Sequence, residues 1–262
     1  MTIDEALLQG ISDELYNALR MAEAVAPLTE RYPALSVENA YAIQQRLLAR
    51  RLQDGERIVG KKIGLTSRAV MNLLGVEQPD FGILTDAMTY NSGEAIPMAA
   101  LIQPKAEGEI AFVLKHDLTG PGVTVADVLR ATEGVMVCFE IVDSRIRDWK
   151  IKIQDTVADN ASCGVFVLGD RLVPVNEVDL SLCGMVLEKN GEIVATGAGA
   201  ATMGSPAVAV AWLANTLGRL GVPLKAGEVI LSGSLGPMIP VAAGDNLRVS
   251  IGGIGSCAVR FA

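Results

Sequence analysis

The stretch Gln103-Pro104-Lys105-Ala106-Glu107-Gly108-Glu109-Ile110-Ala111-Phe112-Val113-Leu114 begins as a loop and continues as an apolar strand. Side chains alternate between the two faces of a strand, so Glu107 and Glu109 point the same way. Two carboxylates that lead into a buried strand repel each other and lose hydration. Because a bound cation would offset both costs, the stretch predicts a metal site at the start of a buried strand.

A third acid, Glu140, lies in a second apolar run over residues 135–143, among neighbours that we expect to be buried. We therefore predict that Glu107, Glu109 and Glu140 hold one divalent metal. Ligation by oxygen alone favours Mg²⁺ or Mn²⁺ over zinc. The alternative for an isolated Glu-x-Glu pair is a solvated strand face, since carboxylates are seldom buried unpaired.

The composition narrows the class of protein. The chain has 262 residues, a net charge of -8 and only 4% aromatic residues, which indicates one large domain with an aliphatic core and argues against nucleic-acid binding. We find neither an apolar run of membrane-spanning length nor a signal-peptide pattern at the N-terminus. We expect the widely spaced cysteines to be reduced core residues of a cytoplasmic protein; they are Cys138, Cys163, Cys183 and Cys257.

The order of local signals predicts an α+β fold. Helical spacing of leucine and isoleucine predicts one helix over residues 3 to about 25 and a second that is capped by Ser36 and ends at Gly55. We expect residues 1–55 to form an N-terminal helical cap and residues 56–262 to form the catalytic domain. Short strands and glycine turns, such as the hairpin signal Asn190-Gly191, predict curved mixed sheets in the second part.

Two other segments carry candidate polar groups. Lys61 and Lys62 lie in a glycine-flanked strand and face opposite ways, so at most one is expected to reach a site; the alternative is an edge strand protected by its charge. Asp80, which follows a proline, is either a simple turn residue or a site acid. The single histidine, His116, precedes a turn and cannot by itself support a zinc site or a Ser-His triad.

Several motifs in the same order resemble the hydratase/decarboxylase branch of the fumarylacetoacetate hydrolase superfamily, and the resemblance covers essentially the whole chain. It implies a mixed β-sheet barrel or roll core with N-terminal helices, dependence on Mg²⁺ or Mn²⁺, and a homo-oligomer. The motifs are KKIGLTS at residues 61–67, PKAEGE at 104–109, FEIVDSR at 139–145, VADNAS at 157–162 and GAGAA at 197–201.

Within the branch, QPDFG at residues 78–82 and RDWKIKIQD at 147–155 resemble the hydratases, which add water to a 2-oxo acid in aromatic meta-cleavage catabolism. The resemblance implies that Asp80 is the acid/base. It makes Lys62 and Lys105 candidates for binding the carboxylate or enolate, and Ser162 a substrate contact. For Lys105, a structural counter-ion of the glutamates is an equal alternative.

Three other functions stay open. Decarboxylation would use the same metal-enolate chemistry, and C–C hydrolysis of an acylpyruvate occurs elsewhere in the superfamily but usually needs a histidine. A non-catalytic subunit that stabilises a decarboxylase is the third. The resemblance also implies a partner, because some members associate with 4-oxalocrotonate decarboxylase.

Overall fold

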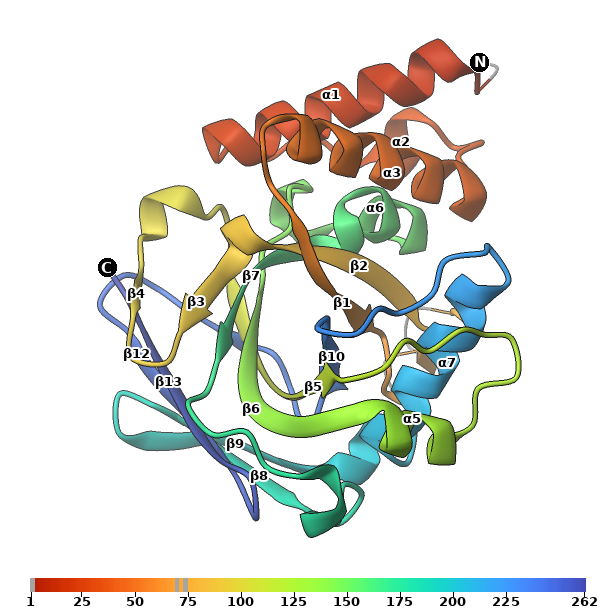
Figure 1. Cartoon of the computed structure of the whole chain (residues 1–262). Coiled ribbons are helices and arrows are strands. Elements are labelled where there is room, and N and C mark those ends of the chain that lie inside the picture. The colour runs from red at the N-terminus through yellow and green to blue at the C-terminus, as the bar shows by residue number, and fades with distance from the viewer. Residues whose placement is uncertain (1–2, 69–70, 73–74) are drawn as a thin grey trace.

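The computed structural model describes residues 3–68, 71–72 and 75–262. Within these ranges the chain forms one mixed sheet of eight strands and a second sheet of five (Figure 1). The larger sheet contains β1 (Ile58–Gly64), β2 (Asp80–Thr85), β3 (Thr89–Asn91), β5 (Lys105–Leu114), β6 (Thr132–Val142), β7 (Cys163–Leu168), β10 (Val229–Ser234) and β11 (Ile239–Pro240). The smaller contains β4 (Ala95–Ile96), β8 (Gly184–Lys189), β9 (Glu192–Ala198), β12 (Asn246–Ile251) and β13 (Gly255–Phe261).

The helices lie around these sheets. Those whose bounds fall in the described ranges are α1 (Glu5–Met21), α2 (Leu28–Arg31), α3 (Val37–Gln53), α5 (Val125–Ala131), α6 (Ile153–Ala158) and α7 (Pro206–Gly218). Short 3₁₀ segments cover Asp86–Met88, Met98–Ala100, Arg147–Trp149, Asn160–Ser162, Val175–Glu177 and Gly199–Ala201. Figure 1 shows α1, α2 and α3 next to α6 at one end of the molecule. All helices in the described ranges are too short or too polar to reach across a bilayer.

The long ladder between β5 and β6 is the centre of the larger sheet, whose order is β2-β1-β10-β5-β6-β7-β3. Its apolar side chains, such as Ile110 and Phe139, pack in one core with Val249 and Val259 of the smaller sheet. Gly108 lies where the sheets meet, and a Cβ there would be 2.6 Å from the Met185 sulfur. A side chain larger than hydrogen would therefore separate the sheets beneath Glu107 and Glu109.

A smaller core joins the N-terminal helices to the rest of the chain. Leu15 and Ile43 from α1 and α3 pack with Val157 of α6 and with Ile146. Helix α1 begins after Asp4, which accepts a hydrogen bond from the Leu7 amide, and α3 begins with a capping box on Ser36. Both helices were predicted; α1 ends at Met21 rather than near residue 25, because Ala22 adopts a left-handed conformation.

The predicted α+β fold with mixed sheets is confirmed, as is the β8–β9 hairpin at Asn190-Gly191. The edge-strand interpretation of the lysines is wrong. Strand β1 lies between β2 and β10, so its ladder is paired on both sides. The lysines therefore do not protect an edge. Lys61 instead forms an ion pair, with Nζ 2.6 Å from a carboxylate oxygen of Glu228.

Candidate active site and metal centre

The register of β5 and β6 brings the three predicted metal ligands together. Glu107 lies directly opposite Glu140, and Glu109 lies on the same face of β5 two residues further on. One carboxylate oxygen of each glutamate lies within 4.8 Å of one oxygen of each of the other two. Three hard oxygen donors at this spacing suit one cation of the Mg²⁺ class.

The hydrogen bonding of the cluster is incomplete. In the described part of the chain, Glu109 Oε1 and both carboxylate oxygens of Glu140 are buried without a hydrogen bond, and of these only Glu140 Oε1 has an ion-pair partner, the Lys62 ammonium at 3.0 Å. Glu109 Oε2 accepts a hydrogen bond of 2.8 Å from the Gly233 amide. Because a buried ionised oxygen without a partner is costly, the unpartnered Glu109 Oε1 and Glu140 Oε2 favour a bound cation.

The pKa values of the cluster follow from the same burial. Burial, followed by the charge of Glu140, raises the pKa of Glu107 to about 7. The pKa of Glu109 is also raised well above its ordinary value, first by burial and then by Glu140 and Glu107. Protons and a divalent cation therefore compete for this cluster.

Lys62 and Asp80 face the cluster from β1 and β2. Lys62 Nζ lies 3.0 Å from Glu140 Oε1 and donates a hydrogen bond of 2.9 Å to the Ala161 carbonyl. Burial lowers the pKa of Lys62, but the charges of Glu140 and Asp80 outweigh this and raise it overall, so the ammonium stays protonated. The open choice between the two lysines is thereby decided, since Lys61 pairs with Glu228 instead.

Asp80 is not a simple solvated turn residue. Its side chain is buried, and Oδ1 has no hydrogen-bond partner within the described residues. Gly64 lies opposite Asp80 in the β1–β2 ladder, and a Cβ on Gly64 would lie 2.1 Å from Asp80 Oδ1, so only glycine leaves room for the carboxylate. Burial raises the pKa of Asp80, while Lys62 opposes the shift. The residue is thus a buried acid beside a fixed cation.

These groups line one cavity of about 350 Å³. Lys62, Asp80, Glu107 and Ser162 all contribute to its wall, whose remaining surface is largely apolar. The other lining residues are Ile63, Gly64, Leu65, Thr66, Ser67, Val142, Trp149, Ile151, Thr156, Ala161, Ala201, Ser234, Gly236, Pro237 and Met238. A cavity of this size holds a small organic acid rather than a polymer.

Ser162 and Lys105, both predicted site residues, differ in their position relative to the cavity. Ser162 lines the cavity, and its Oγ lies 3.1 Å from the Thr156 hydroxyl. Lys105 does not line the cavity; its Nζ lies 4.2 Å from the ring centroid of Trp149, which does. The charge of Lys105 acts to lower the pKa of Glu107. Substrate binding and a counter-ion role both stay predictions for Lys105.

Sequence reasoning missed one wall of the cavity. Ser234 is the last residue of β10, and Gly236 and Met238 lie in the loop that follows; the Gly233 amide at the same end of β10 donates to Glu109. The Ser-Gly-Ser-Leu-Gly-Pro run over residues 232–237 follows an apolar strand and is the signal that identifies this loop. Thr66 lies within the KKIGLTS motif but was not singled out, and Thr156 had no comparable signal, since isolated threonines are common in helices.

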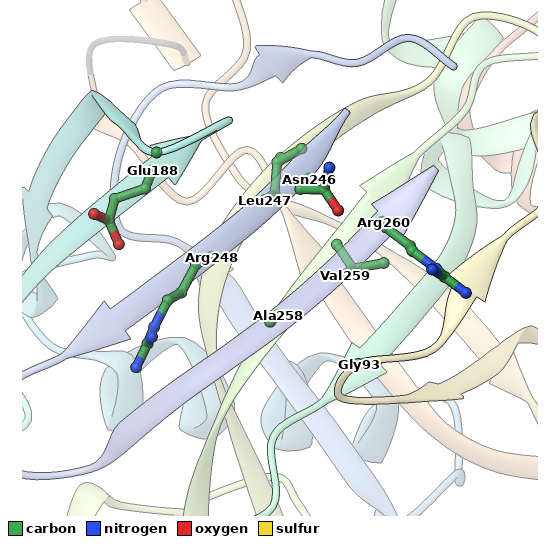
Figure 2. Close-up of a pocket in the computed structure, with 9 residues that line it drawn as sticks. Gly93, Glu188, Asn246, Leu247, Arg248, Ala258, Val259 and Arg260 are labelled. Atoms are coloured by element: carbon green, nitrogen blue, oxygen red, sulfur yellow. The ribbon is translucent and has the colours of Figure 1, made fainter. Parts of the chain in front are cut away.

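A second hollow of about 330 Å³ lies on β12 and β13 of the smaller sheet (Figure 2). Glu188, Arg248 and Arg260 are its charged side chains, and none of the predicted site residues lines it. His116 is exposed two residues after the end of β5. The cavity beside the glutamates is therefore the candidate active site.

The titration of the buried acids predicts how stability depends on pH. The pKa of Glu107 rises from 4.5 to about 7 on folding, so the folded protein binds more protons than the unfolded chain in this window. We expect the melting temperature of the metal-free protein to fall as pH rises from about 4.5 to about 7. Exposed carboxyls with a lowered pKa, such as Asp86, lose their contribution only below this range.

Thermal unfolding in the presence of a chelator measures this slope, and saturating Mg²⁺ is the control. The slope should become shallower with Mg²⁺, because the cation takes the place of the protons. A melting temperature that rises with pH across the window in the chelated protein would contradict the expected coupling.

Comparison with known proteins agrees with this geometry. Residues 63–262 match the family described as "Fumarylacetoacetate (FAA) hydrolase C-terminal". The chain is 57% identical over 260 residues to a 2-hydroxyhexa-2,4-dienoate hydratase of Comamonas testosteroni, with 98% of each chain covered. It is 66% identical over 221 residues to a 2-hydroxypent-2,4-dienoate hydratase of Pseudomonas putida, with coverage of 84% of this chain and 100% of the relative.

Among solved structures, 4-oxalocrotonate decarboxylase from Pseudomonas putida G7, complexed with magnesium and adipate, superposes with a TM-score of 0.97. Its sequence is 39% identical, and the superposition covers 100% of this chain and 99% of the decarboxylase. The family match covers well over half of the chain, and the relatives span nearly all of it. The chain therefore belongs to the fumarylacetoacetate hydrolase family.

Proposed function

We propose that the protein is a divalent-metal-dependent hydratase that converts 2-hydroxypenta-2,4-dienoate (2-oxopent-4-enoate) to 4-hydroxy-2-oxopentanoate in aromatic meta-cleavage catabolism. The observation that supports it best is the buried Asp80 carboxylate, which lines the same cavity as Glu107 and Lys62. Hydration needs a group that moves protons beside an electron-withdrawing site, whereas decarboxylation needs chiefly the electron sink. The hydratases at 57% and 66% identity support the same choice.

In this proposal Glu107, Glu109 and Glu140 hold Mg²⁺ or Mn²⁺. The metal, when bound, supplies a Lewis acid for the carboxylate and 2-oxo oxygens of the substrate. Lys62, held by Glu140 and the Ala161 carbonyl, presents a fixed positive charge to the same oxygens. We assign Ser162, which lines the cavity, to contact the substrate, and Lys105, which lies over the Trp149 ring, to assist.

The reaction requires two proton movements. Ketonisation takes the proton from the 2-hydroxyl and adds one at the terminal carbon C5, which leaves an α,β-unsaturated ketone. Water then adds its oxygen at C4 and a proton at C3. We assign Asp80 to these transfers, because its burial raises its pKa toward the range in which a carboxyl both gives and takes protons.

The proposal extends to the setting of the enzyme. The four cysteines are buried and unpaired, which suits a cytoplasmic protein. A helical cap over residues 1–55 and a catalytic domain over residues 56–262 remain our division of the chain. A homo-oligomer, and a complex with 4-oxalocrotonate decarboxylase, are proposed from the family resemblance.

Supplying the purified protein and Mg²⁺ with two substrates tests the function. We expect 2-hydroxypenta-2,4-dienoate to be consumed with formation of 4-hydroxy-2-oxopentanoate. Loss of the dienol absorbance measures the first, and NMR identifies the product. With 2-oxo-3-hexenedioate we expect no release of CO₂.

The decarboxylase is the alternative, because a decarboxylase has nearly the same backbone. Release of CO₂ from the hexenedioate without hydration of the pentadienoate would establish that alternative and refute the hydratase. Full activity of the chain by itself would exclude the role of a non-catalytic stabilising subunit.

A further inference from the structure

The cavity wall contains three successive residues in a left-handed conformation. Asn160, Ala161 and Ser162 have φ angles of 53°, 52° and 52°. This conformation places Cβ against the following carbonyl, so each residue other than glycine pays a steric cost. Strain of this kind persists only where surrounding contacts enforce it, and it gathers at functional sites.

The turn carries Ser162 and contacts two strands, β1 and β2, that bear the other predicted site residues Lys62 and Asp80. The Ala161 carbonyl accepts the hydrogen bond of Lys62 Nζ, and Ser162 lines the cavity. The Asn160 side chain accepts from the Ile83 amide at 2.8 Å and donates to the Ile83 carbonyl at 2.9 Å. Ile83 belongs to β2, the strand that begins with Asp80. A shift of the turn would therefore move Lys62, Ser162 and the β2 strand relative to one another.

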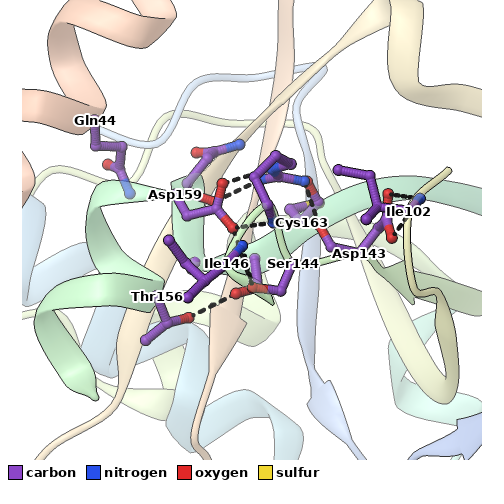
Figure 3. A network of polar contacts seen from close by, with 12 residues as sticks. Gln44, Ile102, Asp143, Ser144, Ile146, Thr156, Asp159 and Cys163 are labelled. Atoms are coloured by element: carbon purple, nitrogen blue, oxygen red, sulfur yellow. Dashed lines mark hydrogen bonds and ion pairs between the residues drawn. The ribbon is translucent and has the colours of Figure 1, made fainter. Parts of the chain in front are cut away.

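A buried ion pair holds both ends of this turn, at Asp159 and Cys163, which are labelled in the polar network of Figure 3. Arg145 donates from Nε to Asp159 Oδ1, and from Nη2 to the Asp159 carbonyl at 2.6 Å. Its Nη1 donates to the Cys163 carbonyl at 2.9 Å, and its own amide donates to Asp159 Oδ2 at 2.9 Å. The guanidinium thus spans the residue before the turn and the residue after it.

The pair itself is buried behind the cavity lining. Arg145 and Asp159 are 2% and 0% exposed, and neither lines the cavity. An ion pair at this depth loses hydration and is often no more stabilising than apolar residues of the same volume. Apolar residues cannot supply the directed N–H donors of the planar Arg145 guanidinium. The geometry around the turn, rather than stability, is therefore the property that this pair secures.

We propose that Arg145 and Asp159 are positioning residues for the reaction: they hold the left-handed turn over residues 160–162, and the turn holds Lys62 and Ser162 in their working positions. The inference rests on the proposed role of this cavity. It assigns a function in turnover to two residues that do not touch the cavity.

The variant Arg145→Lys tests the proposal, with Arg51→Lys as a matched control. Lysine keeps the charge but cannot bridge Asp159 and the Cys163 carbonyl with one planar fork. Arg51 forms a largely enclosed pair with Glu56, at 2.8 Å and with both side chains 10% exposed, and does not line the cavity. We expect kcat per folded molecule to fall roughly 10²-fold in Arg145→Lys, because small misplacements cost that much, and to stay unchanged in Arg51→Lys.

Affinity for Mg²⁺, measured by calorimetry, should stay within about twofold in both variants, because neither arginine contacts the three glutamates. Asn160→Gly is a second test that buries no unpaired charge. Glycine keeps the left-handed backbone but loses both bonds to Ile83, so kcat should fall again with Mg²⁺ affinity retained.

Turnover is measured on whichever of the two substrates the unaltered protein converts. The unaltered protein therefore tests the hydratase assignment, and the variants test the positioning role. Undiminished kcat in Arg145→Lys, or equal losses in Arg145→Lys and Arg51→Lys, would overturn the positioning role. If Arg145→Lys does not fold, Asn160→Gly serves as the test. An undiminished kcat in Asn160→Gly would then overturn the proposal.

Discussion

Replacing Glu109 with glutamine is expected to abolish metal-dependent turnover and, at the same time, to stabilise the metal-free protein. Loss of a Lewis acid worth several kcal/mol corresponds to a fall in kcat of about 10³-fold or more. The amide oxygen keeps an acceptor for the Gly233 N–H, so the local fold is retained. Removing one of three buried charges relieves repulsion within the cluster, whose members lie within 4.8 Å of one another.

Thermal unfolding with and without Mg²⁺ measures both effects. In the unaltered protein, Mg²⁺ at 100 times its Kd should add about 2.7 kcal/mol of stability, whereas Glu109→Gln should gain nothing. Without metal, a gain of about 1 kcal/mol in the variant would raise its Tm by roughly 2–4 °C. Glu133→Gln, on an exposed glutamate of β6, is the control and should behave like the unaltered protein. Retained turnover in Glu109→Gln would refute the metal assignment.

Replacing Asp80 with asparagine is expected to lower kcat by about 10²–10⁴-fold while Mg²⁺ still binds. Asparagine has nearly the same shape, so the space that Gly64 leaves beside Oδ1 stays filled, but it can neither accept nor release the proton. Calorimetry should give an unchanged Kd for Mg²⁺, since Asp80 is not one of the three clustered glutamates.

The intermediate that accumulates identifies the step that Asp80 serves. If it handles the proton at C5, the dienol persists in Asp80→Asn; if it handles water, the unsaturated ketone builds up. Asp170→Asn alters an exposed aspartate and should leave both steps intact. Turnover within twofold of the unaltered protein in Asp80→Asn would remove Asp80 from the mechanism.

Local pattern was enough for most of the fold. Helical spacing of leucine and isoleucine predicted the first long helix, Ser36 caps the second, and Asn190-Gly191 closes the β8–β9 hairpin, because each depends on neighbours within a few residues. The position of β1 inside the sheet could not be read in this way. It pairs with β10, more than 160 residues away, and such pairing depends on the packing of the whole chain.

For the site, alternation along β5 was sufficient to put Glu107 and Glu109 on one face, because strand geometry dictates the direction of successive side chains. Family resemblance supplied Asp80, Lys62, Lys105 and Ser162 as candidates. Sequence spacing could not reveal that Lys105 stands outside the cavity, nor that Lys62 rather than Lys61 faces it, since each outcome depends on partners distant in the chain.

The sequence by itself thus determined a pair of acids on one strand face that lead into an apolar ladder and need a cation. Only the tertiary structure decided how that pair is completed. Strand register places Glu140 opposite Glu107, and Lys62 binds the carbonyl of Ala161, 99 residues further along the chain. Arg145 contacts Asp159, the residue before the turn that contains Ala161. The physical reason is that periodicity determines side-chain direction within an element, whereas these contacts arise only when the sheet curves and its strands pair.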